Sequence, residues 1–315
     1  MSAVPSDTSL WISIVTPCLN RVRFIAEAIE SVLRQDYPRF EHIVVDGGST
    51  DGTLDVLRRY GHLRVVSEAD RGVYDALNKG IRMVRGEIIG HLNSDDLYEV
   101  GVFPELARGF ATHPELDAIY GGAGVFEDPP DGGRRTLAEY VTSEDAAQSL
   151  RAITLGIPII NARFYRRRVY DGIGLYDDSY RIAADREFLL RAEAAGLRAL
   201  HLARPVYWYR QHSGSLTICE ASPHRHETLT EYLRIAEGYL GRAGVSSDVR
   251  RTCRTWHRRE AAEGIILSLR EKRFLGAMCY WLRGWRQDGW WPVALLALAL
   301  PRLAGWISRR WHGRG

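Results

Sequence analysis

The sequence predicts an α/β protein built on a mostly parallel central sheet and followed by a helical C-terminal region. Strand-like and helix-like segments alternate through the first hundred residues, a pattern typical of a parallel sheet with helices on both faces. Polar clusters directly follow several of the expected strands, where ligands of such sheets bind. From about residue 228 onward the chain has the pattern of helices rich in arginine.

The expected elements follow from side-chain periodicity. The first strand is expected at 11–16, because β-branched Ile12, Ile14 and Val15 stand just before a proline. A helix is expected at 23–35, where apolar residues recur on one face. Further strands are expected at 40–45, 63–66 and 87–92, and further helices at 53–60, 74–84 and 185–195. Between 102 and 209 the pattern is mixed, with a turn at 128–133.

Composition bounds the class of protein. The chain has 315 residues, of which 45% are hydrophobic and 26% charged, so it can bury a sizeable core and form more than one unit. We expect an α/β domain at 10–215 and a basic, tryptophan-rich helical region at 216–315. The four cysteines show no metal-ligand spacing and are expected to be reduced thiols: Cys18, Cys219, Cys253 and Cys279. With no secretory pattern at the start, a cytoplasmic protein is expected.

The C-terminal region differs from the rest in charge. Residues 250–315 hold 14 Lys or Arg and four Asp or Glu, whereas the preceding 249 residues hold 28 and 35. Seven of the nine tryptophans lie in the same region. Arginine and tryptophan around an apolar run are typical of an anionic membrane interface, so we expect peripheral contact with the inner membrane face through 281–311. No recognition motif accompanies the basic residues, and no nucleic-acid partner is expected.

Whether the apolar run at 290–307 enters a membrane stays open. Its uninterrupted part, 290–300, is shorter than the roughly 20 residues of a spanning helix, and Pro301 and Arg302 interrupt it. An interfacial helix, a spanning or re-entrant helix and a buried C-terminal helix are all compatible with this pattern.

Asn93-Ser94-Asp95-Asp96 follows an expected buried strand. One interpretation is a helix N-cap with favourable dipole charge. The other is a site for Mn²⁺ or Mg²⁺, because paired carboxylates at the carboxyl end of a strand suit a hard cation. In that case Asp96 would hold the cation directly, and Asp95 would reach a ribose or a metal-bound water.

A second polar cluster, Asp46-Gly47-Gly48-Ser49-Thr50-Asp51-Gly52, follows another expected strand. It is either a glycine-rich turn or a loop whose glycines let backbone approach a ligand closely. Asp46 would then accept a hydrogen bond from a base imide. The Rossmann fingerprint and the P-loop are both excluded, because neither glycine pattern is present.

These clusters belong to three stretches that together resemble glycosyltransferase family 2: Ser-Ile-Val-Thr-Pro-Cys-Leu-Asn at 13–20, Val-Val-Asp-Gly-Gly-Ser-Thr-Asp-Gly-Thr at 44–53 and His-Leu-Asn-Ser-Asp-Asp at 91–96. The resemblance covers roughly 10–215 and implies the GT-A fold, with transfer that generally inverts the anomeric carbon. It also implies a nucleotide-diphosphate sugar donor and a glycan or lipid-linked acceptor. Glu68-Ala69-Asp70-Arg71-Gly72-Val73-Tyr74-Asp75-Ala76-Leu77-Asn78-Lys79-Gly80 resembles the branch that builds bacterial surface polysaccharides and glycolipids.

The resemblance also implies roles for individual residues. Thr16 and Asp46 would contact the base and ribose, and Arg71 would lie near the diphosphate or base. Asp95 and Asp96 stand at the family's Asp-x-Asp element as the metal-binding pair, although Asn93 replaces the outer carboxylate. The expected donor-binding set is Thr16, Pro17, Asn20, Asp46, Gly48, Asp70, Arg71, Asn78, Asn93, Asp95 and His212.

Three positions carry open alternatives. Asp185 matches the family's general base, but a helix-start aspartate paired with a neighbouring arginine would give the same sequence. His212 would help the diphosphate or the metal, or else is a surface-loop histidine. Ile160 stands where related sequences often carry a histidine, which changes the acceptor side.

Two other functions remain compatible with the pattern. A nucleotidyltransferase uses similar metal and carboxylate chemistry, but it would need a basic, glycine-containing triphosphate loop, and Cys18-Leu19-Asn20 offers no glycine. A protein that binds a nucleotide sugar without turnover is the other alternative.

Overall fold

The chain divides into two compact units, Met1–Ala221 and Ser222–Gly315. The computed structural model describes residues 10–129, 132–141, 149–156, 159–212, 224–287, 289 and 291. Each unit has its own apolar core, so we describe the two separately.

The first unit begins with alternating strands and helices: β1 (Ile12–Cys18), α1 (Ile25–Leu33), β2 (Phe40–Asp46), α2 (Thr53–Leu57), β3 (Leu63–Ser67), α3 (Val73–Met83) and β4 (Ile88–His91). Strand β1 pairs in parallel with both β2 and β4, and β2 pairs in parallel with β3. The predicted parallel sheet is therefore confirmed, with element ends that differ from the expectation by a few residues.

The second half of this unit makes the sheet mixed. It contains β5 (Leu97–Tyr98), α4 (Val102–Thr112), β6 (Ala118–Glu127), β7 (Arg135–Tyr140), α5 (Leu150–Leu155), β8 (Arg163–Arg166), α6 (Arg167–Ile173), α7 (Ala184–Ala194) and β9 (Ala199–Arg210). In the described residues the strand order is β3-β2-β1-β4-β8-β6-β9-β5, with β7 paired to β6. Strand β8 runs antiparallel to both neighbours, whereas β6 and β9 are parallel.

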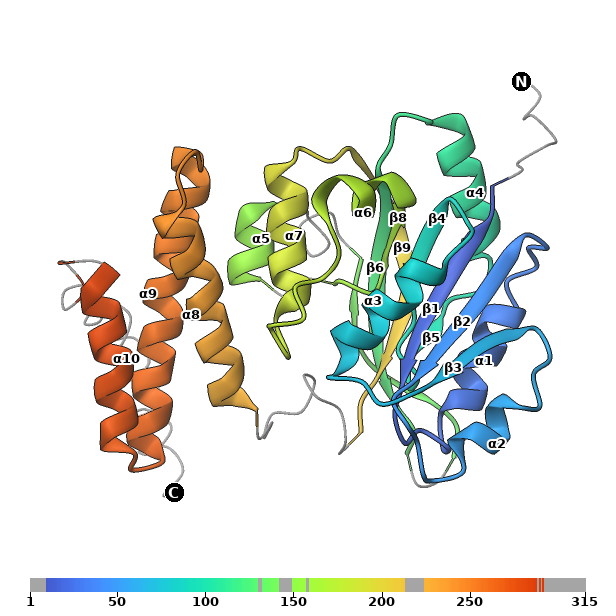
Figure 1. Cartoon of the computed structure of the whole chain (residues 1–315), viewed down its shortest axis with the longest axis horizontal. Helices are drawn as coiled ribbons and strands as arrows, with labels where there is room; N and C mark the ends of the chain where they lie inside the picture. Colours follow the sequence, from blue (N-terminus) through green and yellow to red (C-terminus); the bar gives the residue numbers. More distant parts are fainter. Residues whose placement is uncertain are drawn as a thin grey trace, which may run out of the picture. The chain divides into compact units, whose positions relative to one another are not determined.

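Helices cover both faces of the sheet (Figure 1). Successive side chains of a strand point to opposite faces, and β1 shows this division. Ile12 and Ile14 pack in the cluster that includes α1 and α4, whereas Val15 packs in the cluster that includes α3, α6 and α7. Helix α3 lies very close to the sheet, since a Cβ atom at Gly80 would be 2.3 Å from Val15 Cγ1.

Two neighbouring arginines tie the ends of two helices to the junction of β8 and α6. Arg166 donates from Nη2 to the carbonyl of Phe110, in the last turn of α4, at 2.8 Å. Arg167 donates from Nη2 to the carbonyl of Val84, at the end of α3, at 2.9 Å. Both bonds satisfy carbonyls that have no partner inside their own helix.

The second unit is an arginine-rich set of helices, as the sequence predicts: α8 (Arg225–Gly241), α9 (Ser247–Arg270) and α10 (Phe274–Gln287). Helix α10 packs closely on α9, because a Cβ atom at Gly264 would be 2.5 Å from the Tyr280 ring. Among the described residues, no helix has the length and hydropathy of a membrane span.

Some expectations fall outside the described residues. Apart from Trp291, this holds for the run 290–307, and it holds for part of the turn expected at 128–133. Cys18, Cys253 and Cys279 are free thiols, and Cys219 lies outside the described part of the chain.

Candidate active site

The carboxyl ends of β1, β2 and β4 meet at one edge of the sheet. Cys18 and Asp46 end paired strands as register partners, and the N–H of Gly47 donates to the carbonyl of Cys18 at 2.8 Å. The Cys18 thiol contacts the side chain of Ser94 just beyond β4. The three sequence stretches at 13–20, 44–53 and 91–96 therefore converge.

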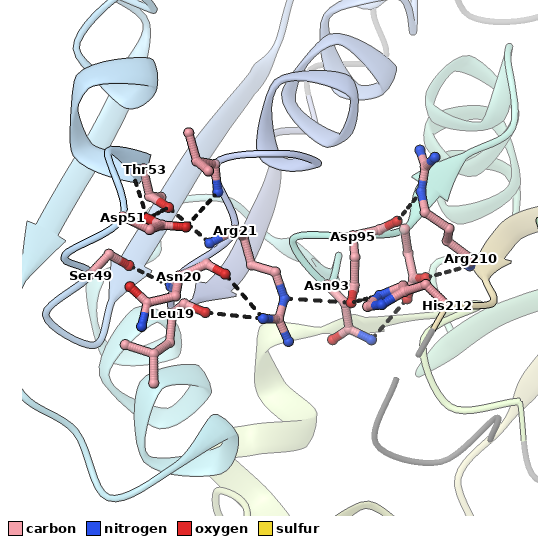
Figure 2. A network of polar contacts seen from close by, with 12 residues as sticks. Leu19, Asn20, Arg21, Ser49, Asp51, Thr53, Asn93, Asp95, Arg210 and His212 are labelled. Atoms are coloured by element: carbon pink, nitrogen blue, oxygen red, sulfur yellow. Dashed lines mark hydrogen bonds and ion pairs between the residues drawn. The ribbon is translucent and has the colours of Figure 1, made fainter. Parts of the chain in front are cut away.

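The loop after β1 is fastened to the loop after β2 (Figure 2). Asn20 has a φ of 53°, in the left-handed region that asparagine tolerates. Four hydrogen bonds join the loops: Asn20 N–H to Ser49 Oγ at 2.7 Å, Thr50 N–H to Asn20 Oδ1 at 2.9 Å, Val22 N–H to Asp51 Oδ2 at 3.1 Å and Arg21 N–H to Thr53 Oγ1 at 2.8 Å. The expected ligand-binding residue Asn20 thus shapes the rim of the site through its own hydrogen bonds.

Asp46 is fully buried and has one occupied and one unoccupied carboxylate oxygen. Its Oδ2 accepts from the N–H groups of Gly48 and Ser49, at 3.1 and 3.0 Å, and from Ser67 Oγ at 2.7 Å. Its Oδ1 has no hydrogen-bond partner among the described residues. Because an unpartnered buried polar atom is unfavourable, Oδ1 is available to a ligand with one N–H group.

Asp70 and Arg71 lie beside this loop, at the start of α3. A Cβ atom at Gly47 would be 2.5 Å from Asp70 Oδ2, and Asp70 Oδ1 accepts from Gly72 N–H at 2.9 Å. The Arg71 side chain is 73% exposed and forms ion pairs with Asp75 and Asp178.

Asp96 is almost entirely buried, with 3% of its surface exposed. Its Oδ1 accepts from the N–H of Arg210 at 2.8 Å, and its Oδ2 accepts from the Tyr207 hydroxyl at 2.7 Å and from Asn93 Nδ2 at 2.9 Å. Burial, followed by the nearby negative charge of Asp95, raises the pKa of Asp96 to about 7. Both oxygens therefore bond to the protein, which leaves Asp96 less accessible to a cation than the sequence analysis expects.

The Asp95 carboxylate instead lies between the Arg21 guanidinium and the His212 ring, as Figure 2 shows. Its Oδ2 lies 3.0 Å from His212 Nε2 and 3.6 Å from Arg21 Nε. The Asp95 and His212 side chains are 16% and 17% exposed. His212 is therefore part of the site, and its ring also packs 4.7 Å, centroid to centroid, from Phe24.

Among the described residues, at most two side chains at this site converge as ligands for a cation. No group of three or more His, Cys, Asp or Glu side chains is arranged to hold a metal ion in the described ranges. The Asp95 carboxylate and His212 imidazole nevertheless converge, and both are ligand types that Mn²⁺ accepts. Sites of this kind commonly use one or two protein ligands together with substrate phosphates.

Arg210 was missed by the sequence analysis, and its strand context gives no signal for it. The side chain is 1% exposed and lies between the rings of Phe24 and Phe126, 5.1 and 4.7 Å from their centroids. It donates to the Asp95 carbonyl at 2.9 Å and forms ion pairs with Glu27 and Asp128. Arg210 thereby positions the segment that carries Asp95.

Asp185 lies in the first turn of α7 and is partly exposed. Its Oδ1 accepts from the N–H of Arg186 at 2.6 Å, and the Arg186 guanidinium donates to the carbonyls of Ile153 and Gly156 at the end of α5. Burial raises the pKa of Asp185. A carboxylate with a raised pKa is a better proton acceptor.

Asp185 and Asp96 belong to one region of the unit. Both carboxylates lie near enough to Tyr209 for their charges to act on it: burial first, then Asp96 and Asp185, raise the pKa of Tyr209. The expected general base thus lies within electrostatic reach of the same ring as the Asp-x-Asp segment.

Two expected donor-binding residues use their polar atoms inside the protein. Thr16 is fully buried, and its hydroxyl lies 2.9 Å from His42 Nε2. Asn78 is buried, and its amide exchanges two hydrogen bonds with the backbone of Tyr176, at 2.8 and 3.0 Å. Through these hydrogen bonds both side chains hold neighbouring segments in place.

Two further expected positions are defined by the backbone. Pro17 lies within β1 opposite Val45. Gly48 has a φ of 91°, which favours glycine at this turn. Ile160, in place of the expected family histidine, is partly exposed.

Comparison with solved structures defines the class of protein. TarS of S. aureus, residues 1–349 in complex with UDP-GlcNAc, superposes with a TM-score of 0.60 at 18% identity, over 89% of this chain and 92% of that chain. The mannosyltransferase PcManGT from Pyrobaculum calidifontis, in complex with GDP-Man and Mn²⁺, gives 0.59 at 19% identity, over 95% and 89%. The fold is that of the GT-A glycosyltransferases.

Sequence comparison then gives the family. Residues 13–174 match the sequence model of Glycosyl transferase family 2, slightly more than half of the chain. The chain is also 32% identical over 185 residues to the PGL/p-HBAD biosynthesis glycosyltransferase of Mycobacterium tuberculosis, covering 57% of this chain and 68% of the relative. This protein therefore belongs to glycosyl transferase family 2, and it is a glycosyltransferase.

Proposed function

We propose that the protein transfers a sugar from a nucleotide-diphosphate donor to a hydroxyl of a glycan or lipid-linked acceptor, with inversion and with a divalent cation. The observation that carries this proposal is the meeting, at one sheet edge, of the unpartnered Asp46 Oδ1 and the Asp95–His212 pair. One group suits a nucleotide base and the other a metal-bound diphosphate. The nucleotide sugars bound by TarS and PcManGT support a donor of this class.

Asp46 indicates which kind of base the donor carries. Its Oδ2 already accepts three hydrogen bonds, so only Oδ1 is available. A single acceptor matches the one imide N–H of uracil or thymine, whereas guanine presents two neighbouring donors. We therefore favour a uridine or thymidine diphosphate sugar.

Asp95 and His212 are the residues that we propose as ligands of a Mn²⁺ or Mg²⁺ ion. Such an ion, when bound, offsets the negative charge that collects on the leaving diphosphate. Asp96 has a positioning role instead. It accepts hydrogen bonds from Arg210 N–H, Tyr207 and Asn93, and these bonds fix the turn that presents Asp95. This assignment transfers the direct ligand role from Asp96 to Asp95.

Asp185 is the residue that we propose as the general base. It takes the acceptor hydroxyl's proton while the acceptor oxygen bonds to the anomeric carbon and the carbon–phosphate oxygen bond breaks. Attack and departure on opposite sides of that carbon give an inverted product. The burial that raises the pKa of Asp185 strengthens it as a base.

The replacement Asp185→Asn tests this assignment, with Asp171→Asn on α6 as a control of equal charge change at an exposed position. Transfer and donor binding are measured with a panel of UDP, dTDP and GDP sugars and Mn²⁺. We expect Asp185→Asn to lose at least 100-fold in kcat, the lower range of general-base catalysis, while the donor Kd stays unchanged. The proposal would be refuted if Asp185→Asn transferred the sugar with the kcat of the wild type. It would also be refuted if the wild-type protein bound none of the nucleotide sugars in the panel.

We further propose that α10 rests on an anionic membrane surface. Its exposed side chains recur at helical spacing and form one apolar face: Phe274, Leu275, Met278, Trp281, Leu282 and Trp285. Lys272, Arg273 and Arg286 border this face and are exposed, which suits acidic lipid head groups.

Vesicles of phosphatidylcholine with 30% phosphatidylglycerol, used in sedimentation, test the surface. The double replacement of Phe274 and Leu275 by Ser should weaken binding about 100-fold or more, given roughly 1.5–3 kcal/mol for each large side chain that the membrane buries and a factor of ten for about every 1.4 kcal/mol. Val100→Ser, at a 61% exposed position in the first unit, is the control. Equal sedimentation of both variants and the wild type would exclude this role for α10.

A further inference from the structure

Arg21 is a basic residue inside the candidate site that the resemblance does not assign. Its Nε lies 3.6 Å from Asp95 Oδ2, the same oxygen that His212 Nε2 approaches at 3.0 Å. Figure 2 shows the Arg21 guanidinium between the loop after β1 and the Asp95 carboxylate. The side chain is 29% exposed, so a ligand in the site can reach it.

Hydrogen bonds to the loop after β2 fix the backbone around Arg21, whereas, among the described residues, only two long hydrogen bonds and one ion pair hold its side chain. Its N–H donates to Thr53 Oγ1, and its neighbours Asn20 and Val22 are bonded to the loop after β2. Nη1 donates to the carbonyls of Leu19 and Asn20 at 3.2 Å each. In the described part of the chain Nη2 has no hydrogen-bond partner, so the fork keeps a donor for a ligand.

Arg21 also lies near both ends of the site. The loop that carries it is hydrogen-bonded to the loop that follows Asp46, and its Nε lies 3.6 Å from Asp95 Oδ2. A nucleotide that extends from Asp46 to Asp95 would therefore pass the Arg21 guanidinium with its phosphates.

We propose that Arg21 exchanges partners during donor binding: it pairs with Asp95 in the free enzyme and with a donor phosphate oxygen in the complex. This inference rests on the proposed function. The planar fork of arginine matches phosphate oxygens. A guanidinium beside Asp95 also repels an incoming cation, so its departure toward the phosphate frees Asp95 as a ligand and makes cation and diphosphate bind cooperatively.

The proposal predicts effects of opposite sign on two ligands. Without the Arg21 charge, Asp95 attracts a lone cation more strongly. Without the Arg21 fork, a diphosphate loses a charged hydrogen bond. A merely structural role in the loop would weaken the binding of both ligands together.

The experiment measures binding to the full-length chain by calorimetry. The ligands are MnCl₂ alone, and inorganic pyrophosphate, UDP and GDP, each in EDTA and again with MnCl₂ present. For Arg21→Gln we expect a Mn²⁺ Kd about threefold lower, as for one partly exposed ion pair. We expect a Kd for pyrophosphate and for the bound nucleotide about tenfold higher, as for one lost hydrogen bond to a charged group. The control Arg34→Gln removes the same charge from a side chain just after α1 that is 57% exposed, and both Kd values should stay at wild type.

Arg21→Lys keeps the measurement decisive if Arg21→Gln does not fold. Lysine retains the positive charge but lacks the paired N–H donors of the guanidinium. Mn²⁺ binding should therefore match wild type, while pyrophosphate binding weakens. If either variant binds both ligands more weakly, the exchange is overturned and the proposed function stands. The same holds if both Kd values stay unchanged while the wild type binds both ligands. If wild type binds neither nucleotide nor pyrophosphate in the presence of Mn²⁺, the proposed function itself fails.

Discussion

His212 Nε2 lies 3.0 Å from Asp95 Oδ2 although 117 positions separate the two residues in the chain. The pair joins the segment just before β5 to the segment just after β9, so the site depends on the antiparallel pairing of these two strands, in which Leu97 lies opposite Trp208. Residues on either side of the pair have different proposed functions: Asp46 and Arg21 would bind the nucleotide, and Asp185 would act on the acceptor.

His212→Asn should weaken Mn²⁺ binding and lower kcat/KM at limiting Mn²⁺ at least tenfold. Tenfold is the lower end of the loss in metal affinity or activity seen when residues that support a metal site are replaced. The shorter side chain no longer places a nitrogen at the Nε2 position, 3.0 Å from Asp95 Oδ2, and an amide is a much poorer ligand than imidazole. A Mn²⁺ titration of activity measures the change. His113→Asn, at an exposed ion pair with Glu115, is the control. An unchanged Mn²⁺ requirement in His212→Asn would remove His212 from the metal site.

Asp46→Asn should weaken nucleotide binding without a comparable loss of folding stability. The remaining oxygen can accept from Gly48 and Ser49 N–H, so the amide nitrogen then faces the base as a donor and cannot pair with its imide. Calorimetry with UDP should show a Kd raised by about tenfold or more, as for an unpaired buried polar group. The exposed Asp55→Asn on α2 should bind as wild type does.

Arg210→Ala should destabilise the first unit by about 2–4 kcal/mol, because it removes a buried charge whose partners are partly exposed. The loss is measured by urea unfolding followed by intrinsic fluorescence. Arg204→Ala, which breaks an ion pair with Glu105 at 33% side-chain exposure, should lose less than about 1 kcal/mol. Equal losses in the two variants would mean that burial between Phe24 and Phe126 adds nothing.

Glu237 should make the second unit sensitive to acid. Burial opposes its ionisation, but hydrogen bonds from His257 and Arg283 outweigh burial and lower the pKa to about 2, from 4.5. A lowered carboxyl pKa adds stability above the unfolded value and loses it as pH falls from about 4.5 to about 2.

Urea unfolding between pH 7 and pH 2 checks this. We expect Glu237→Gln to be less stable than wild type by about 1–2 kcal/mol at pH 7, since the Glu237 side chain is 27% exposed and partly screened. The difference should shrink below pH 4. A difference that is constant with pH would show that the charge of Glu237 is not involved.

The first half of the fold is readable from the sequence because its signals are local. Strands β1 to β4 pair in parallel, mostly with near neighbours in the chain, and each alternates with a helix of clear apolar period. The second half is less readable because β6 to β9 combine antiparallel and parallel pairings between distant segments. No local pattern sets that order.

The site shows the same division. The sequence predicts that Asp46 and the Asp95–Asp96 pair share one edge, because strand ends in a parallel sheet do so. It does not predict which of the adjacent carboxylates is accessible, because neighbouring side chains point in different directions and either one could face inward. Asp96 turns to Tyr207 and Asp95 to His212, and both partners come from β9 or just beyond it.

The arginines at the start of α6 have a consequence for how this protein tolerates change. Arg166 binds the end of a helix on one side of the sheet, and its neighbour Arg167 binds the end of a helix on the other. Replacing one of them would release one helix end. Deleting a single residue just before them would turn each guanidinium group to the opposite face of the sheet, away from the helix end that it binds. Evolution and protein engineers alike should therefore find the length of this junction harder to alter than its composition.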